Sequence, residues 1–259
     1  MHLLVSKQEN LLSQINKKTF LSVVIPLYNE EARLTTGLSS VIAHLSKQKY
    51  QSEIILVNDG STDKTLKHAK EFQKKNPGRI KVISYKQNRG KGFAVKKGVL
   101  ASNGSWVLFT DIDLSVPITQ LRKFQKYLSK PPKVLIASRR IRGARITYHQ
   151  PIIREALGHF FTKLSNLILN TRCSDLTCGF KIFDRNSAKK LFAKQRLNRW
   201  GFDSEIIFLA YKFQIPIIEI PVTWNNSPET KVKFPQDLIG SFAELIQIRL
   251  NKKKGLYEE

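Results

Sequence analysis

Short apolar runs separated by longer segments of mixed polarity dominate the first half of the chain. Continuous runs rich in strand-forming residues are typical of strands buried on both faces of a parallel sheet. We predict strands at residues 21–26, 53–58, 80–84, 105–110 and 133–137. Segments with helical spacing or helix-start and helix-stop signals lie between them, at 30–45, from the turn 59–63 to 76, and from 88–92 to 103. This alternation predicts an α/β fold with a doubly wound, mostly parallel sheet.

Two amphipathic segments follow in the second half. Between Arg154 and Asn170 one helical face is apolar, with Leu157, Phe160, Phe161, Leu164, Leu167 and Ile168. The stripe fits either core packing or a helix lying in a membrane interface, and the pattern leaves both open. A second stripe spans Leu238–Leu250, and the lysines at 252–254 that follow it suit anionic lipid.

Asp111 and Asp113 directly follow the fourth apolar run. Residues i and i+2 of an extended chain point to the same side, so we expect the two carboxylates to face one place. At the carboxyl end of a parallel strand, that place is where ligands bind. Neighbouring carboxylates repel each other unless a cation intervenes, and Mg²⁺ or Mn²⁺ shared with a substrate phosphate would satisfy them. Two aspartates at this spacing are also common at ordinary turns. The residues around the pair therefore determine whether it indicates a metal site.

Three turns follow predicted strands and should meet at one edge of the sheet: 27–30, 58–61 and 111–113. Tyr28 could lie against a nucleotide base, and Asp59 could accept hydrogen bonds from its N–H groups. Arg89 and Lys91 stand at a glycine-rich helix start, where phosphate binds readily. Each turn alone is weak evidence for a ligand site, but the three turns in this order predict a nucleotide site.

The composition of the chain limits the kinds of partner that it is expected to bind. The chain has 259 residues with 44 Lys+Arg against 20 Asp+Glu, a formal charge of +24. An excess of this size implies an anionic partner, either nucleic acid, a phosphorylated substrate or an anionic membrane. Only Cys173 and Cys178 are present, which favours a reducing compartment. We predict neither a signal peptide nor a membrane-spanning run.

Several motifs occur in an order that resembles the family-2 nucleotide-sugar glycosyltransferases of the GT-A fold, within them the dolichyl- or polyprenyl-phosphate glucosyltransferase group, and more distantly dolichol-phosphate mannose synthase. They are Val24–Glu30, Val57–Asp63, Asn88–Gly92, Thr110–Ile118, Asp175–Lys181, Gly201–Glu205 and Val222–Trp224. The resemblance implies that a nucleotide-sugar site, a divalent metal and a lipid-phosphate acceptor belong together in this chain.

The same resemblance implies roles for matching residues. The nucleoside would be held by Pro26, Tyr28, Glu30 and Asp59. The metal and diphosphate would be held by Asp111 and Asp113, and Ile112 between them would belong to the nucleotide-sugar site. The acceptor phosphate would meet Arg139 and Arg154, and the departing diphosphate would meet Lys181 and Lys231. Two positions depart from the family pattern. Asn58 replaces the first carboxylate of the usual D-D-G-S, and Ser115 stands where the mannose-synthase branch has a Gln metal ligand.

We therefore expect an inverting enzyme that moves a hexose, glucose above others, from UDP-glucose to a polyprenyl or dolichyl phosphate. The expected arrangement is an arm at 1–19, a GT-A domain at 20–231 and a C-terminal amphipathic helix with a basic tail at 232–259. The protein would be peripheral on the cytoplasmic face of a membrane, and a membrane partner subunit is compatible with this. A lipid phosphate is already ionised at neutral pH and needs no strong base.

Other functions stay open. The donor could be GDP-mannose or another sugar nucleotide. With a sugar-hydroxyl acceptor, Asp203 or Glu205 would be the base; otherwise these carboxylates would order neighbouring arginines. A basic nucleic-acid-binding protein explains the charge but gives the carboxylate turns no role. An inactive adaptor on the same fold would not need the intact aspartate pair.

Overall fold

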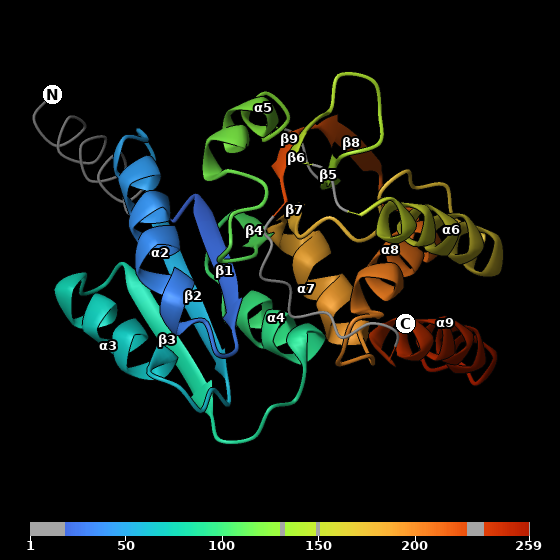
Figure 1. Ribbon diagram of the computed structural model, residues 1–259, viewed down its shortest axis with the longest axis horizontal. Coiled ribbons are helices and arrows are strands. Elements are labelled where there is room, and N and C mark those ends of the chain that lie inside the picture. The colour runs from blue at the N-terminus through green and yellow to red at the C-terminus, as the bar shows by residue number, and fades with distance from the viewer. Residues whose placement is uncertain (1–18, 130–132, 149–150, 227–235, 259) are drawn as a thin grey trace, which may run out of the picture.

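A seven-stranded sheet forms the centre of the computed structural model, which describes residues 19–129, 133–148, 151–226 and 236–258 (Figure 1). The strand order is β3-β2-β1-β4-β7-β5-β8. The bounds are β1 Leu21–Leu27, β2 Ser52–Asp59, β3 Ile80–Tyr85, β4 Trp106–Thr110, β5 Val134–Ser138, β7 Phe180–Asp184 and β8 Ile217–Pro221. All neighbours are parallel except β7, which is antiparallel to β4 and to β5. The predicted mostly parallel α/β sheet is confirmed.

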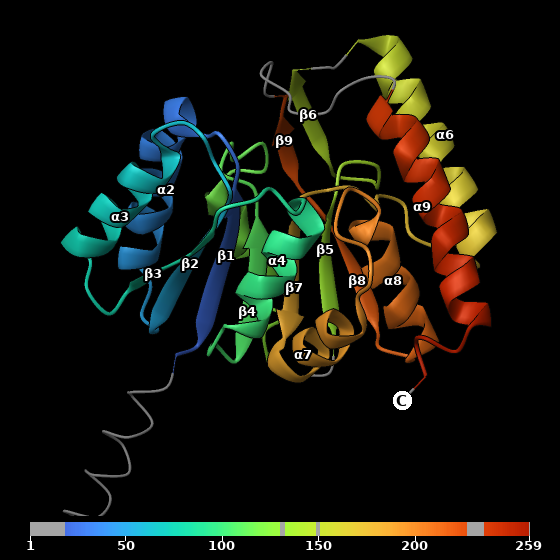
Figure 2. The ribbon, with the colours of Figure 1, turned by 90° about the horizontal axis from the view of Figure 1, so that it is seen from below.

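Helices cover both faces of the sheet (Figure 2). On one face lie α2 Glu31–Ser46, α3 Thr65–Lys75, η1 Ile118–Gln120 and α5 Leu121–Gln125. On the other face lie α4 Lys91–Leu100, α7 Arg185–Lys194 and α8 Phe202–Lys212. Alternate residues of β1 enter the two cores, because successive side chains of a strand point to opposite faces: Val23 and Ile25 on the α2 side, Val24 on the α4 side.

A small second sheet pairs β6 Arg145–Tyr148 with β9 Thr223–Asn225 in parallel. Beside it, α6 Ile152–Leu169 packs along α9 Gln236–Lys253. The ring centroids of Phe161 and Phe242 lie 5.4 Å apart at this contact. Both predicted amphipathic helices therefore exist, and they pack against each other. Among the described residues, no helix is long and apolar enough to cross a membrane.

The stripe predicted on α6 divides between two environments. Phe161 is buried and Ile168 packs against the core, whereas Phe160 is 57% and Leu167 77% exposed. On α9, Leu245 and Ile248 are fully buried, whereas Ile239 and Ile246 are more than half exposed. Each helix thus has one apolar face in the core, as the core-packing alternative predicted, and further apolar side chains in solvent.

The sheet register brings the ends of three strands together. Leu27 of β1 pairs with Asn58 of β2, and Val24 of β1 pairs with Phe109 of β4. The loops that follow β1, β2 and β4 consequently open at one edge of the sheet, as predicted from the order of the turns.

Candidate nucleotide-sugar site

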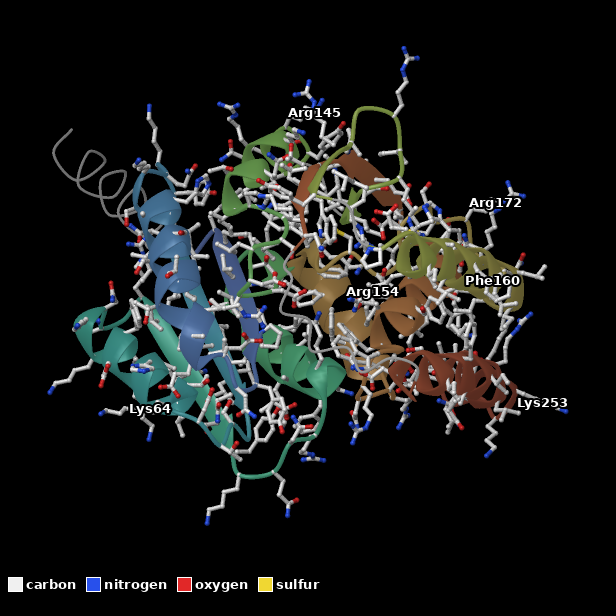
Figure 3. The ribbon with its side chains drawn as sticks, in the orientation of Figure 1. Lys64, Arg145, Arg154, Phe160, Arg172 and Lys253 are labelled. Carbon is white, nitrogen blue, oxygen red and sulfur yellow. The ribbon has the colours of Figure 1, made fainter. Side chains whose placement is uncertain are left out.

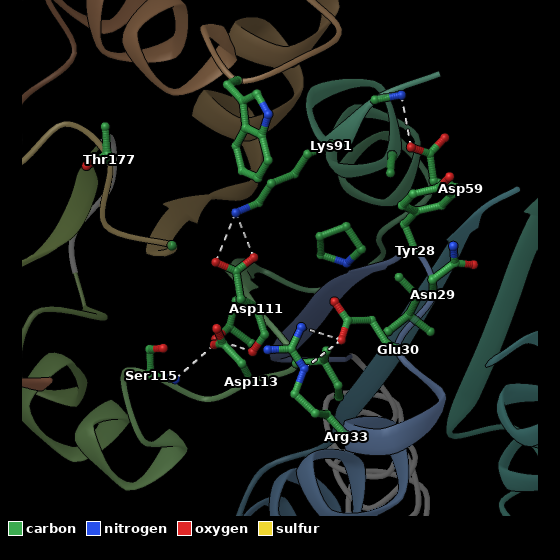
Figure 4. A pocket seen from close by; sticks show the side chains of 18 of the residues that line it. Tyr28, Asn29, Glu30, Arg33, Asp59, Lys91, Asp111, Asp113, Ser115 and Thr177 are labelled. Atoms are coloured by element: carbon green, nitrogen blue, oxygen red, sulfur yellow. Dashed lines mark hydrogen bonds and ion pairs between the residues drawn. The ribbon is translucent and has the colours of Figure 1, made fainter. Parts of the chain in front are cut away.

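A cavity of about 750 Å³ lies at this edge of the sheet (Figure 4). The first half of the chain contributes the loops after β1, β2 and β4 and the start of α4. The second half contributes the segments around Arg139, Thr177–Gly179 and Arg199–Trp200, together with Trp224, Asn226 and Asp237. Of the residues predicted from the sequence, the cavity collects Pro26, Tyr28, Glu30, Asp59, Lys91, Asp111, Ile112, Asp113 and Arg139.

The loop after β1 is fixed by hydrogen bonds to the loop after β2. Asn29 has a left-handed backbone (φ 53°), and its Oδ1 accepts from the Thr62 backbone N–H at 2.8 Å. Its own N–H donates to Ser61 Oγ at 3.0 Å. Tyr28 stays 41% exposed at the rim of the cavity. An aromatic ring presented in this way offers a face for a base to stack on.

Asp59 lines the cavity, but its carboxylate is occupied by the chain. Its Oδ1 accepts from the Arg89 backbone N–H at 2.7 Å, and its Oδ2 accepts from Gly90 N–H at 2.9 Å and Asn88 Nδ2 at 3.0 Å. Gly60 permits this close approach, because a Cβ there would lie 2.7 Å from Asn88 N. Asp59 thus shapes the loop 88–90, and its oxygens already have donors other than a nucleotide base.

The turn that bears Asp111 and Asp113 differs from the predicted extended chain. β4 ends at Thr110, and the aspartates stand in a turn closed by Leu114, whose φ is +49°. The i, i+2 argument was therefore wrong for this segment, although both aspartates do line the same cavity. Asp113 Oδ1 accepts from the Ser115 backbone N–H at 2.9 Å, which fixes its direction.

Lys91 and Asp111 form an ion pair in the cavity. The lysine Nζ lies 2.8 Å from Asp111 Oδ1 and 2.9 Å from Oδ2. Removal from water raises the pKa of Asp111; Lys91 opposes this shift and Asp113 adds to it. Burial alone would lower the pKa of Lys91, but the carboxylates of Asp111 and Asp203 raise it above its usual value. Gly179 closes the other side, since a Cβ there would lie 2.0 Å from Asp111 Oδ2.

Arg139 lines the cavity on the side of the second half. Its Nε and Nη2 bind the two oxygens of the buried Asp175, each at 2.7 Å, and Nη2 also lies 3.0 Å from Thr177 Oγ1. Its guanidinium carbon stands 5.2 Å from the centre of the Trp224 ring. Burial alone would raise the pKa of Asp175, but the charge and hydrogen bonds of Arg139 hold this pKa below its usual value. Asp175 therefore orients Arg139 at the cavity wall.

Other predicted site residues lie elsewhere. Lys181 is 1% exposed and pairs with buried Asp203 at 2.5 Å, so neither lines the cavity and the roles expected for them there are not supported. Glu205 is fully buried; its oxygens accept from the backbone N–H groups of Arg196 and Leu197, and burial raises its pKa. Both alternative bases are structural carboxylates.

Two predicted arginines also lie outside the cavity lining. Arg89 stacks on Phe93, with its guanidinium carbon 3.8 Å from the ring centre. Arg154 is half-buried in the first turn of α6. Lys231 lies outside the described residues.

Sequence analysis missed several lining residues, among them Arg33, Thr177, Arg199, Trp200 and Asp237. Arg33 pairs with Glu30 at 2.7 Å across one helical turn. Trp200 lies beside Lys91, whose Nζ is 5.4 Å from the indole centre. The signal that could have found it is the placement of Arg199-Trp200 directly before the Gly201–Glu205 motif.

Known proteins resemble this chain in sequence. Residues 22–192 match Glycosyl transferase family 2. The chain is 35% identical to a Saccharomyces cerevisiae dolichyl-phosphate beta-glucosyltransferase, covering 95% of this chain and 79% of that protein. It is 32% identical to the Dictyostelium discoideum protein of the same name, covering 92% and 76%.

Solved structures share the fold. A mannosyl-3-phosphoglycerate synthase from Rubrobacter xylanophilus superposes with a TM-score of 0.65 at 18% identity, covering 93% of this chain and 76% of that one. A glucosyl-3-phosphoglycerate synthase from Mycobacterium tuberculosis in complex with Mn²⁺, UDP-glucose and phosphoglyceric acid gives 0.57 at 19% identity, covering 89% and 79%. The α/β architecture is thus that of GT-A glycosyltransferases.

Proposed function

The chain belongs to glycosyl transferase family 2, and from this premise we propose that it transfers glucose from UDP-glucose to the phosphate of a dolichyl or related polyprenyl lipid. The proteins that it resembles at 32–35% identity over most of its length carry the name dolichyl-phosphate beta-glucosyltransferase. The product would be a β-linked lipid-phosphate glucose, formed with inversion at the anomeric carbon of the α-linked donor.

The donor would lie along the first-half loops. Tyr28 offers its exposed ring to the base, and the loop 88–90, held by Asp59, presents the start of α4. Positive charge for the diphosphate is supplied by Lys91, while Arg33 and Arg199 add charge to the cavity wall. Neutralising the leaving diphosphate is the largest electrostatic need of this reaction.

A divalent ion fits the aspartate pair. Asp111 and Asp113 are hard oxygen donors in one cavity, and the Lys91 ammonium already lies against Asp111 as a cation does. The described residues include no cluster of three His, Cys, Asp or Glu side chains that could hold a metal, so diphosphate oxygens and water would complete the coordination. When bound, Mg²⁺ or Mn²⁺ would act as a Lewis acid on the departing diphosphate.

The acceptor side favours a phosphate, and the observation that carries this is the position of the carboxylates. The two acids that the sequence predicted as bases for a hydroxyl acceptor, Asp203 and Glu205, are buried in structural contacts, which leaves Asp237 as the cavity carboxylate to test for that role. A phosphate monoester is ionised at neutral pH and attacks without a base. Arg139, held by Asp175, presents positive charge at the cavity wall, where it would align that phosphate with the anomeric carbon.

A lipid acceptor also needs an apolar approach. Asp237 lines the cavity at the start of α9, and Ile239, 65% exposed, stands two residues further along. Ile153, Phe160 and Leu167 follow at intervals of seven on the adjacent α6, all exposed. Figure 3 shows Phe160, Arg172 and Lys253 at the same end of the molecule, where cationic and apolar side chains occur together. We assign this surface to the membrane interface.

The proposal is tested by initial rates with a fixed set of donors and acceptors. Labelled UDP-glucose and GDP-mannose are each supplied with dolichyl phosphate or with free dolichol, in detergent containing Mg²⁺. The proposal predicts rapid transfer only for the combination of UDP-glucose with dolichyl phosphate. Equal transfer to dolichol would refute the phosphate acceptor, and faster transfer from GDP-mannose would refute the donor. Asp237→Asn serves as a further variant, because this carboxylate lines the cavity and would be the base for a hydroxyl acceptor. We expect it to keep its rate within about tenfold.

A further inference from the structure

Lys91 occupies the aspartate site as a cation. Its Nζ contacts both oxygens of the Asp111 carboxylate, at 2.8 and 2.9 Å, and Figure 4 shows the ammonium pointing into the cavity between Asp111 and an indole ring. The same Nζ lies 5.3 Å from the centre of the Phe109 ring and 5.4 Å from that of Trp200. One carboxylate and two aromatic rings thus surround this positive charge.

The backbone that carries Lys91 is held firmly. Gly90 has a φ of +102°, and a Cβ there would lie 2.4 Å from the Asn198 carbonyl oxygen. That oxygen also accepts from the Phe93 N–H at 3.0 Å. The start of α4 therefore cannot withdraw, and Lys91 can leave Asp111 only by rotation of its flexible side chain.

A divalent ion and this ammonium compete for the same oxygens. Mg²⁺ would need direct bonds of about 2.0–2.1 Å to carboxylate oxygens, and both Asp111 oxygens already face Lys91. The two cations would also repel each other at such short range in a site partly removed from water. The diphosphate of a donor offers the displaced ammonium an alternative anion within the same cavity.

We propose that Lys91 is a built-in counter-ion of the empty site, exchanged for the divalent ion when the nucleotide diphosphate arrives. Lys91 then turns from Asp111 to the diphosphate. The ion and the nucleotide therefore bind cooperatively, and the site binds the ion weakly on its own. This inference rests on the proposed use of a divalent ion by the transferase, and it assigns Lys91 a positioning role toward that ion.

The test measures Mn²⁺ binding without turnover. Free Mn²⁺ is followed by electron paramagnetic resonance during titration of the protein, with and without saturating UDP. The variants are Lys91→Met and Lys91→Gln, which remove the charge, and Lys97→Met as the control, since Lys97 is an exposed lysine on the same helix. Thermal unfolding establishes that each variant is folded, and Lys91→Gln replaces Lys91→Met if that variant is not.

Removal of the Lys91 charge should tighten Mn²⁺ binding in the absence of UDP by about tenfold, because the ion no longer has to displace an ammonium from the Asp111 carboxylate. UDP should strengthen Mn²⁺ binding strongly in the wild type and in Lys97→Met. The effect should be smaller in the Lys91 variants, because these have no ammonium on Asp111 for the diphosphate to draw away. Weaker or unchanged Mn²⁺ binding in both Lys91 variants without UDP would overturn the inference.

The outcome separates this inference from the proposed function. If no protein binds Mn²⁺ with or without UDP while glucose transfer proceeds, the exchange is refuted and the function stands. If the Lys91 variants bind Mn²⁺ more tightly but the wild-type protein transfers no glucose to dolichyl phosphate, the exchange stands and the function is refuted.

Discussion

Several carboxylates around the cavity are engaged by the chain itself, which separates the structural residues from those left for substrate. Asp59 accepts three hydrogen bonds from residues 88–90. Asp175 accepts hydrogen bonds from Nε and Nη2 of Arg139. Asp113 has a backbone contact to Ser115, and Asp111 holds an exchangeable lysine. The last two are therefore the carboxylates to test for the reaction.

Replacement of Asp113 by asparagine should abolish most activity without unfolding the protein. The amide keeps the shape, and its oxygen can still accept from the Ser115 N–H, but the negative charge is lost. We expect kcat/KM to fall by at least about a hundredfold, or roughly 3 kcal/mol of transition-state stabilisation. Rates in Mg²⁺ and melting curves check this; full activity of the wild type in excess chelator would contradict it.

Asp175→Asn should destabilise the protein in a pH-dependent way. The aspartate is fully buried and paired with Arg139, so its loss leaves an uncompensated charge at a cost of about 3–5 kcal/mol. The pKa of Asp175 is lowered in the folded state, so the pair stabilises the fold above the ordinary value of 3.8 and is lost as pH falls below it. Urea unfolding at neutral and acidic pH should show the wild-type advantage shrinking below pH 3.8. A constant difference down to lower pH would contradict this.

The sequence predicted the part of the cavity lining that comes from the first half of the chain better than the part from the second half. Tyr28, Asp111 and Asp113 line the cavity because they follow strands that pair in register, and Lys91 lines it from the start of α4. Lys181 was placed wrongly, because nothing in the local sequence reveals that it is buried against Asp203. A charged residue at a motif position does not show which residue, distant in the sequence, it pairs with in the fold.

At the scale of elements, the aspartate turn shows a limit of periodicity. Five predicted strands are present within a residue or two, because continuous apolar runs mark buried strands clearly. The pattern could not show that Leu114 has a left-handed backbone in the turn after β4, or that β7 inserts antiparallel between β4 and β5. Strand order depends on contacts distant in sequence, which local spacing does not encode.

Helices α6 and α9 carry the prediction for membrane binding. Phe160→Ser combined with Leu167→Ser removes two exposed apolar side chains and should barely change stability. Each side chain inserted into lipid is worth about 1.5–3 kcal/mol, so we expect binding to anionic vesicles to fall by at least about tenfold. Vesicle sedimentation measures this, with Leu100→Ser on α4 as the matched control because Leu100 is also exposed. Equal loss in the control would argue against this surface.

At the scale of the whole molecule, the C-terminal segment is connected to the cavity wall. Tyr257 is fully buried, and its hydroxyl donates to Glu205 Oε1 at 2.5 Å. Glu205 in turn holds the backbone at 196–197, with one residue between it and the pair Arg199 and Trp200. The domain boundary predicted at residues 231 and 232 lies outside the described residues, but the segment after it shares the core of the main sheet.

Tyr257→Phe should affect both stability and donor binding. Loss of a buried hydrogen bond to a charged group costs about 1.5–3 kcal/mol. Because the loop bearing Trp200 loses support, we expect KM for UDP-glucose to rise severalfold while kcat changes less. Urea unfolding and initial rates measure the two effects, and Tyr148→Phe is the control, since Tyr148 is 67% exposed. An unchanged KM would leave Tyr257 with a role in stability alone.

The formal charge of +24 acts on the whole molecule. Exposed charges are screened over about 8 Å at physiological ionic strength, so added salt should release part of the protein from anionic vesicles. The apolar contacts of α6 and α9 should persist in salt. Equal binding to neutral and anionic vesicles at low salt would contradict the electrostatic contribution.

The central claim is that this cavity joins glucose to a lipid phosphate with inversion. The most direct test is the structure of the product made by the purified protein from dolichyl phosphate and UDP-glucose labelled at its anomeric carbon. Nuclear magnetic resonance of the extracted lipid should show the labelled carbon in β configuration and coupled to phosphorus. An α-linked product, or a labelled carbon with no coupling to phosphorus, would contradict the account.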